Sequence, residues 1–154
     1  MDLKLQSFTH LNAKGTFKIT YNMAISHFAN HITSLLGFKK EPDVIIPEFF
    51  MRINNNENGS LNLNIKGPKN KFDDRLIEEF KNKYNAIVIF EDNHITIDAA
   101  LIVILEDIVK MIENDLPNQF DKIIVDDRFV HINRNNDNSI KYFEFQFNVT
   151  PIDE

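Results

Sequence analysis

Two histidines, His27 and His31, stand four residues apart in the stretch HFANH. On a helix this spacing brings two imidazoles onto one side, where they can share a metal ion such as zinc. A hydrolytic zinc site of this spacing normally carries a glutamate directly after the first histidine, but here that residue is Phe28. Two polar residues on the flank of a helix explain the pair more simply, so we expect no metal. The alternative is a metal-dependent hydrolase whose third ligand is His94, His131 or Asp127.

Acidic side chains gather at two further places, in residues 91–94 (EDNH) and in Asp126-Asp127 upstream of His131. Paired carboxylates can hold a divalent metal or divide the acid and base roles of a reaction. The first cluster falls where a tight turn is needed, and Asp and Asn favour turns for backbone reasons. The second falls where the alternation of a strand slips, which indicates a turn or a bulge. We therefore predict no catalytic residues and no cofactor.

Phosphate-binding motifs are missing from the sequence. The chain has four glycines, and none of them lies in the glycine-rich loop of a dinucleotide or nucleotide site. The stretch 67–71 (GPKNK) is a short basic turn that could contact a phosphate, but a solvated loop is the favoured interpretation.

The composition is that of a globular protein, with 154 residues, 43% of them hydrophobic, and a formal net charge of -6. This charge repels nucleic acids and anionic membranes on average, so either partner would need a local basic patch. The absence of cysteine excludes disulfides, thiolate ligands and a cysteine nucleophile, and it is typical of a reducing compartment. With no signal peptide at the start, we expect a cytoplasmic protein. The abundance of Asn, Ile, Phe and Lys is often found in AT-rich genomes, which suggests a bacterial or phage origin.

Hydrophobic spacing predicts a hairpin followed by a helix, three times over, and then a final hairpin. Gly37 is expected to end the first helix, Asp73 to cap the second, and Asp98 and Pro117 to bound the third. The expected strands lie near residues 3–5, 17–21, 49–53, 61–65, 86–90, 94–97, 123–132 and 142–149, and the expected helices near 22–37, 74–84 and 99–114.

Strands joined by short turns form antiparallel sheets, and strands with one polar and one apolar side are covered on one side only. We therefore predict the α+β class: a two-layer domain with three helices packed mainly on one face of an antiparallel sheet, which is either open or strongly curled. No linker or low-complexity segment divides the chain, so we expect one domain over residues 1–154.

The same alternation predicts which residues face away from the helices. This outer face is locally basic and aromatic, and its candidate partner-binding residues are Phe8, Lys18, Phe50, Arg52, Lys66 and Tyr142. Aromatic and basic residues suit a protein partner or single-stranded nucleic acid. The strand KYFEFQFNV lacks the glycines of an RNA-binding strand motif, and its phenylalanines alternate towards the core, so we rank a protein partner first.

The leading functional hypothesis is a non-enzymatic protein-binding module, with an inhibitor, immunity, antitoxin or chaperone-like role, that docks through a sheet face or edge. A metal-dependent hydrolase and a single-stranded nucleic-acid-binding protein are the alternatives. The last strand carries Phe and Val and is expected at a sheet edge, which must be paired or covered. A homodimer through an edge strand is therefore also expected.

Overall fold

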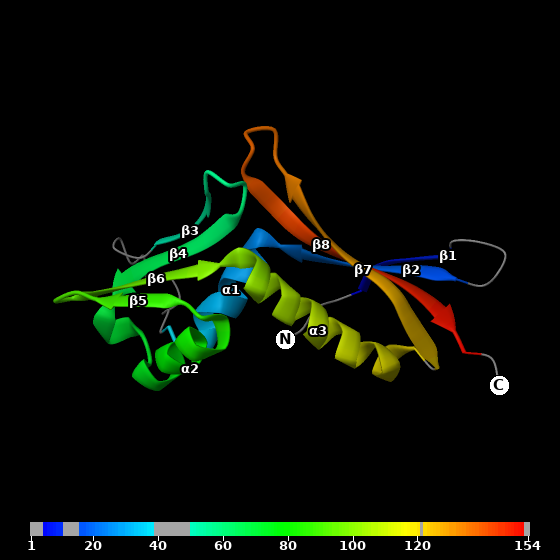
Figure 1. Ribbon diagram of the computed structural model, residues 1–154, viewed down its shortest axis with the longest axis horizontal. Helices are drawn as coiled ribbons and strands as arrows, with labels where there is room; N and C mark the ends of the chain where they lie inside the picture. The colour runs from blue at the N-terminus through cyan, green and yellow to red at the C-terminus, as the bar shows by residue number, and fades with distance from the viewer. Residues whose placement is uncertain (1–4, 11–15, 39–49, 121, 153–154) are drawn as a thin grey trace. The chain divides into compact units, whose positions relative to one another are not determined.

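The computed structural model describes residues 5–10, 16–38, 50–120 and 122–152, with the side chains of 5–10 and 118–119 excepted. Its elements follow the predicted order, with the hairpins and helices alternating along the chain (Figure 1). They are β1 (Leu5–His10), β2 (Phe17–Ala24), α1 (Ile25–Leu35), β3 (Phe50–Asn55), β4 (Leu61–Pro68), the 3-10 turn η1 (Lys69–Lys71), α2 (Asp74–Tyr84), β5 (Ile87–Phe90), β6 (His94–Ala100), α3 (Leu101–Gln119), β7 (Ile123–Arg134) and β8 (Ile140–Pro151). The α+β class is confirmed, and every strand pair is antiparallel.

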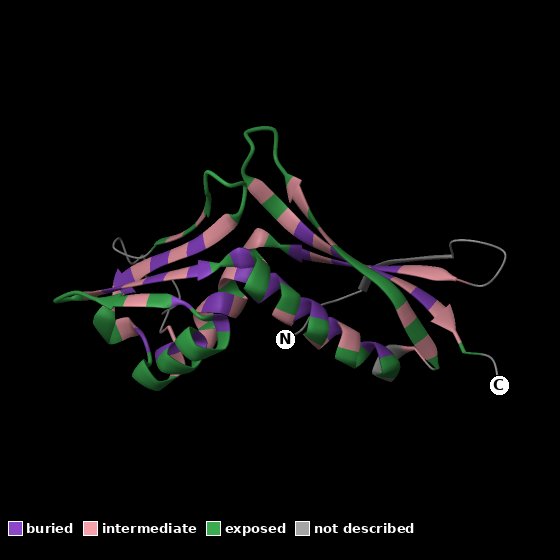
Figure 2. Cartoon of the chain, viewed as in Figure 1, coloured by how far each residue is buried: buried purple, intermediate pink, exposed green. Residues whose placement is uncertain are grey.

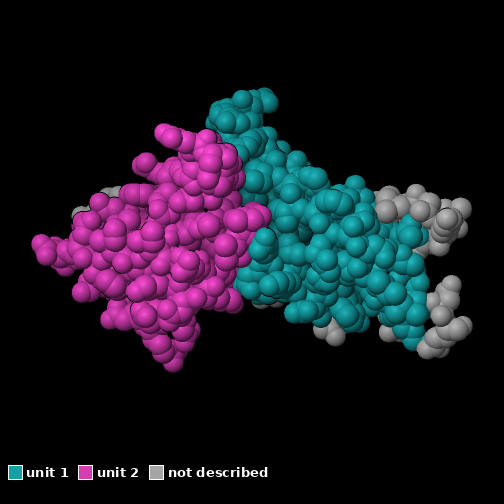
Figure 3. Space-filling view, in the orientation of Figure 1, with its two compact units in different colours: residues 1–28, 106–154 teal, residues 29–105 magenta. Residues whose placement is uncertain are grey.

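The strands form two four-stranded sheets where the sequence predicted one. Sheet A has the order β1-β2-β8-β7, and sheet B has the order β3-β4-β6-β5. The last strand, β8, is therefore central, and its expected place at an edge is wrong. The chain divides into two compact units, residues 1–28 with 106–154 and residues 29–105, so that each sheet belongs to one unit (Figure 3). The expectation of a single domain stays a prediction.

Sheet A has an aromatic inner face. Phe143, Phe145 and Phe147 alternate along β8 and are fully buried, as the spacing predicted (Figure 2). Their register partners on β2 are also buried, and Phe143 contacts Phe28 edge-on at 5.0 Å between ring centroids. Each buried phenylalanine removes a large apolar area from water, so this strand contributes strongly to the stability of the unit.

Sheet B has an aliphatic inner face. Leu63 and Ile65 of β4 pair with Ala99 and Ile97 of β6, and all four are buried. Helix α2 contributes a buried stripe to the same unit at the helical spacing predicted from the sequence, formed by Ile77, Phe80 and Tyr84.

Two of the predicted helix ends are confirmed. The Asp73 carboxylate accepts hydrogen bonds from the backbone N–H groups of Arg75 (3.0 Å) and Leu76 (3.1 Å), which caps α2. Gly37 follows α1 with φ of 64°, in the left-handed region that favours glycine.

The two predicted ends of the third helix are wrong. Asp98 lies inside β6, because the strand continues to Ala100 before α3 begins. Pro117 lies within α3, near its end, and does not close it. A proline removes one backbone hydrogen bond and crowds the C=O four residues before it, but its fixed φ is compatible with a helix, and here the helix continues to Gln119.

The β3–β4 and β7–β8 hairpins close with the same turn. Residues 56–60 (NENGS) and 135–139 (NNDNS) both begin with Asn and end with Ser, and the first N–H donates to the last C=O at 2.8 Å in each. The fourth residue, Gly59 or Asn138, has a positive φ in both turns. This recurring pattern was visible in the sequence and was missed there.

Candidate interaction surface

The outer face of sheet B, the one turned away from its buried residues, is defined by the strand register, because directly paired residues share a face. One row runs Phe50–Lys66–Thr96–Ile89 across the four strands. The next row runs Arg52–Asn64–Asp98–Ile87. We call these eight residues the sheet B outer face.

Large apolar side chains stand at both margins of the sheet B outer face. Phe50 on β3 is 37% exposed, and at the opposite margin Ile87 and Ile89 on β5 are 63% and 51% exposed. The two central strands place polar, half-buried side chains between them. The surface therefore has an apolar rim on each side of a polar centre.

The Phe50 margin is organised by a cation–π contact. The Arg52 guanidinium carbon lies over the Phe50 ring, 4.7 Å from the ring centroid. Both residues remain exposed. An exposed contact of this kind contributes about 0.5–1 kcal/mol and leaves both groups available to a partner.

The polar centre is held by a chain of side-chain hydrogen bonds. The Asn56 amide donates to the Asn62 oxygen at 3.0 Å, and the Asn62 amide donates to the Asp98 carboxylate at 2.8 Å. The Asp98 carboxylate thus fixes the Asn62 side chain on this face of the sheet. Asp98 was predicted to cap a helix, and this hydrogen bond was not predicted from the sequence.

The six partner-binding residues predicted from the sequence are divided between the two sheets. Phe50, Arg52 and Lys66 lie together on the sheet B outer face. Lys18 and Tyr142 lie on the polar face of sheet A, where Lys18 pairs with Asn148 and Tyr142 with Ala24 and Asn133. Phe8 is the register partner of Ile19, and its side chain is outside the described residues. Of the predicted surface, the candidate surface keeps only the three sheet B residues, Phe50, Arg52 and Lys66.

Four exposed apolar residues of the two outer faces were missed: Ile87 and Ile89 on sheet B, and Ile124 and Phe129 on sheet A. Ile87 and Ile89 belong to the stretch AIVIF, which is apolar at every position, so alternation could not say which residues face outwards. Phe129 on β7 is 44% exposed and stacks on His131 at 6.3 Å, and the slipped alternation around Asp126-Asp127 hid it.

The slip itself is a β-bulge between Val125 and Asp127, as expected, and the Thr150 hydroxyl donates to the Asp126 carboxylate at 2.5 Å. The other acidic cluster forms the predicted turn, in which the Glu91 N–H donates to the His94 C=O at 2.9 Å. His27 and His31 are half-buried on α1. Within the part of the chain that the structure describes, no group of three or more His, Asp or Glu side chains could hold a metal ion.

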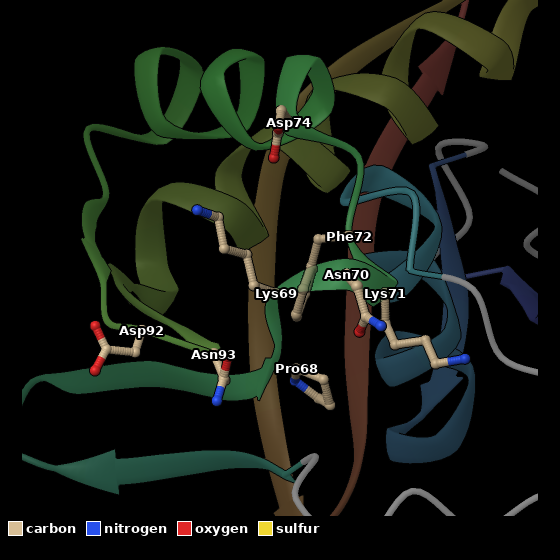
Figure 4. A pocket seen from close by; sticks show the side chains of 8 residues that line it. All are labelled: Pro68, Lys69, Asn70, Lys71, Phe72, Asp74, Asp92 and Asn93. Atoms are coloured by element: carbon tan, nitrogen blue, oxygen red, sulfur yellow. The ribbon is translucent and has the colours of Figure 1, made fainter.

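The basic turn at residues 67–71 borders an open hollow of about 760 Å³ (Figure 4). Lys69 and Lys71 line it together with two carboxylates, Asp74 and Asp92. The two lysine side chains point in different directions in Figure 4. This mixed lining offers no concentrated positive charge to a phosphate.

No family model, no curated protein and no solved structure matches this chain. Of the helices in the described residues, none is long and apolar enough to cross a membrane.

Proposed function

We propose that this chain is a non-enzymatic, cytoplasmic protein-binding module that docks a partner protein on the sheet B outer face. The observation that carries the proposal is the exposed Phe50–Arg52 pair on the sheet B outer face, in which the Arg52 guanidinium lies over the Phe50 ring, 4.7 Å from its centroid. Inhibitor, immunity, antitoxin and chaperone-like roles all require such a docking surface.

Physical chemistry favours a protein ligand for this surface. Aromatic residues and arginine are enriched at the centres of protein interfaces, where a ring supplies apolar area and a guanidinium supplies directed hydrogen bonds. The partner should cover Phe50 with an apolar side chain and offer a carboxylate to Arg52 or Lys66. The cysteine-free sequence supports the cytoplasmic assignment.

The test is quantitative capture from the native host with the wild-type chain and with the double variant Phe50→Ala, Arg52→Ala. Removing a central aromatic–arginine pair should lower the recovery of a specific partner at least about tenfold. Phe129→Ala is the matched control, because it removes an aromatic of similar exposure from the other sheet. Equal recovery with all three proteins, or no partner with the wild-type chain, would contradict the proposal.

The two alternatives predict different measurements. Single-stranded nucleic-acid binding through Arg52 and Lys66 predicts an affinity that falls steeply with salt. The net charge of -6 and the Asp98 carboxylate on the same face oppose it. A metal-dependent hydrolase using His27 and His31 predicts stoichiometric metal in the purified protein and a higher melting temperature on metal addition.

A further inference from the structure

Among the strands that the structure describes, β5 forms one edge of sheet B, and its four residues, Ile87 to Phe90, are all apolar. Ile87, Ile89 and Phe90 are 63%, 51% and 54% exposed. An edge strand presents unpaired backbone N–H and C=O groups, and an apolar one is a template for pairing with another strand. Ile87 and Ile89 belong to the sheet B outer face, but the Phe50–Arg52 pair lies on β3 at the opposite margin of the sheet, so substitutions at the two margins test different contacts.

Two hydrogen bonds fix which backbone groups of β5 point outwards. The Glu91 N–H donates to the His94 C=O at 2.9 Å, which directs Glu91 towards β6. Residues alternate in an antiparallel ladder, so Ile87 and Ile89 also point their N–H and C=O groups at β6. Val88 and Phe90 therefore point theirs to the free side. The hydrogen bond from the Lys69 N–H to the Asn93 C=O (2.8 Å) leads to the same assignment independently. It directs the N–H and C=O groups of the odd-numbered residues of β6 towards β4, so those of the even-numbered residues, which pair with Ile87 and Ile89, point towards β5.

The other edges with described side chains carry features that oppose pairing. Strand β7 has a bulge and three consecutive charges at Asp126, Asp127 and Arg128. Strand β3 carries the charge of Arg52 in its middle and two asparagines at its end. Bulges and charges are the usual protections of an edge, and β5 has neither.

We propose that β5 pairs antiparallel with β5 of a second copy of this chain, with Ile89 on the twofold axis. A twofold axis perpendicular to the sheet keeps each face on its own side and places one residue opposite its own copy. For the largest overlap of two four-residue strands, this residue is one of the two in the middle of β5, Val88 or Ile89. With Ile89 on the axis, Val88 of each copy pairs with Phe90 of the other, and every outward group of these residues finds a partner. With Val88 on the axis, Phe90 would face Ala86, whose N–H already donates to the Lys81 C=O at 3.0 Å.

The side chains and charges of this register are self-complementary. Ile89 meets Ile89 of the second copy on the outer face, and Val88 meets Phe90 on the inner face, so apolar groups cover apolar groups. The acidic turn Glu91-Asp92 of one copy comes beside the first residues of β5 in the other copy. These residues follow the last turn of α2, which carries Lys81 and Lys83. The twofold axis makes this charge pairing occur twice.

The interface is small. One four-residue strand pair buries less than the roughly 1,200 Å² of a stable complex, so the association belongs to the weak class. We expect a monomer at about 10 µM and a growing dimer fraction between about 0.1 and 1 mM.

Sedimentation over that concentration range tests the proposal with charge variants of the residue on the axis. Ile89→Lys and Ile89→Glu should each weaken the dimer at least about tenfold, because identical charges then face one another. Mixing the two variants should restore a heterodimer. Ile87→Lys is the matched control on the same strand and face: it would meet Glu91 of the second copy and should leave dimerisation equal or stronger.

Hydrogen exchange provides a second readout that does not depend on substitution. The Val88 and Phe90 amides should exchange fast at low concentration and become protected as the dimer forms, while the Ile89 amide is protected throughout. A wild-type chain that stays monomeric to about 1 mM would overturn the proposal. So would an Ile89→Lys variant that dimerises like the wild type, or a variant mixture that stays monomeric.

Discussion

Sheets A and B share one plan and differ in what they present to the surroundings. Each joins two hairpins through their second strands, β2 with β8 in sheet A and β4 with β6 in sheet B. Sheet A has an aromatic inner face, and its central outer positions are polar, as at Lys18, Glu144 and Gln146. Sheet B has an aliphatic inner face and exposes Phe50, Ile87 and Ile89 at the margins of its outer face.

The difference between the sheets indicates which strand positions can change without loss of the fold. Among the strands whose side chains are described, the two central strands of each sheet supply the fully buried residues, and these positions are constrained by packing. The edge strands carry most of the exposed apolar residues of the sheets, on β3 and β5 in sheet B and on β7 in sheet A. Binding properties are therefore expected to change through edge-strand substitutions, while central-strand substitutions change stability.

The largest expected effect comes from removing one core side chain from each sheet. Phe145 on β8 and Ile97 on β6 are both fully buried. Phe145→Ala should lower the free energy of unfolding by about 3–5 kcal/mol, and Ile97→Ala by about 2–5 kcal/mol, because each leaves a cavity. Urea unfolding followed by circular dichroism measures both losses.

The same two variants test the expectation of one domain. If the units unfold together, each substitution shifts a single transition in both units, as hydrogen exchange in each sheet would report. A variant that destabilises only its own sheet, leaving protection in the other unchanged, would show two independently folding units and sharpen the contrast between them.

The next largest effect is a difference in stability between alanine substitutions at two glycines of the unit that contains sheet B. Gly37 has φ of 64°, and an added Cβ would lie 2.6 Å from the Asp73 Cβ and 2.8 Å from the Leu76 Cδ1. Gly59 has φ of 86°, and nothing described lies within 4 Å of the same position. Gly37→Ala should therefore cost about 2–4 kcal/mol through backbone strain and a clash, but Gly59→Ala only about 1 kcal/mol through strain. Similar losses in thermal unfolding would show that the contact between Gly37 and Asp73 is unimportant.

Local patterns in the sequence were enough to predict the elements. Alternation placed Phe143, Phe145 and Phe147 in the core, and the Asp73 cap followed from side-chain chemistry at a helix start. These inferences succeed because the physical cause lies within a few residues of the effect.

The pairing of hairpins was not available from local patterns. Strand β2 pairs with β8, with Ile19 opposite Phe147, across most of the length of the chain. Any strand with a buried face could satisfy such a pairing, so the sequence did not separate one sheet from two. The candidate surface depended on this pairing, which is why Lys18 and Tyr142 were grouped with Phe50 and now lie on a different sheet.

A smaller effect compares the matching turns of the two sheets. The Ser60 hydroxyl donates to Asn58 at 2.6 Å, and the Ser139 hydroxyl donates to Asp137 at 2.5 Å, which holds the pKa of Asp137 below its ordinary value. Ser60→Ala and Ser139→Ala remove equivalent bonds. Each should lower the free energy of unfolding slightly and to a similar extent in urea denaturation, because both bonds lie in exposed turns. A large difference between them would show that the two turns share a sequence pattern without sharing an energetic role.

The smallest effect concerns an ion pair that sheet A has between a helix and an edge strand. The Arg128 guanidinium on β7 donates to the Glu113 carboxylate on α3 through two nitrogens, with Nε at 2.8 Å, and this hydrogen bonding holds the pKa of Glu113 below its ordinary value. A lowered pKa means that the folded state binds the proton less tightly than the unfolded chain does. The pair therefore stabilises the protein above the ordinary pKa of Glu113, and this stabilisation is lost as the pH falls through the lowered pKa.

Glu113→Gln should thus be less stable than the wild type at neutral pH, by under about 1 kcal/mol because both side chains are partly exposed. The two proteins should become equally stable in acid. Glu106→Gln, which changes an exposed carboxylate on the same helix, should shift neither the neutral stability nor its pH dependence by as much. If both variants follow the same pH curve, the link between α3 and β7 is a surface contact without consequence. In that case the bulge and the charges of β7, without the link to α3, protect this edge of sheet A.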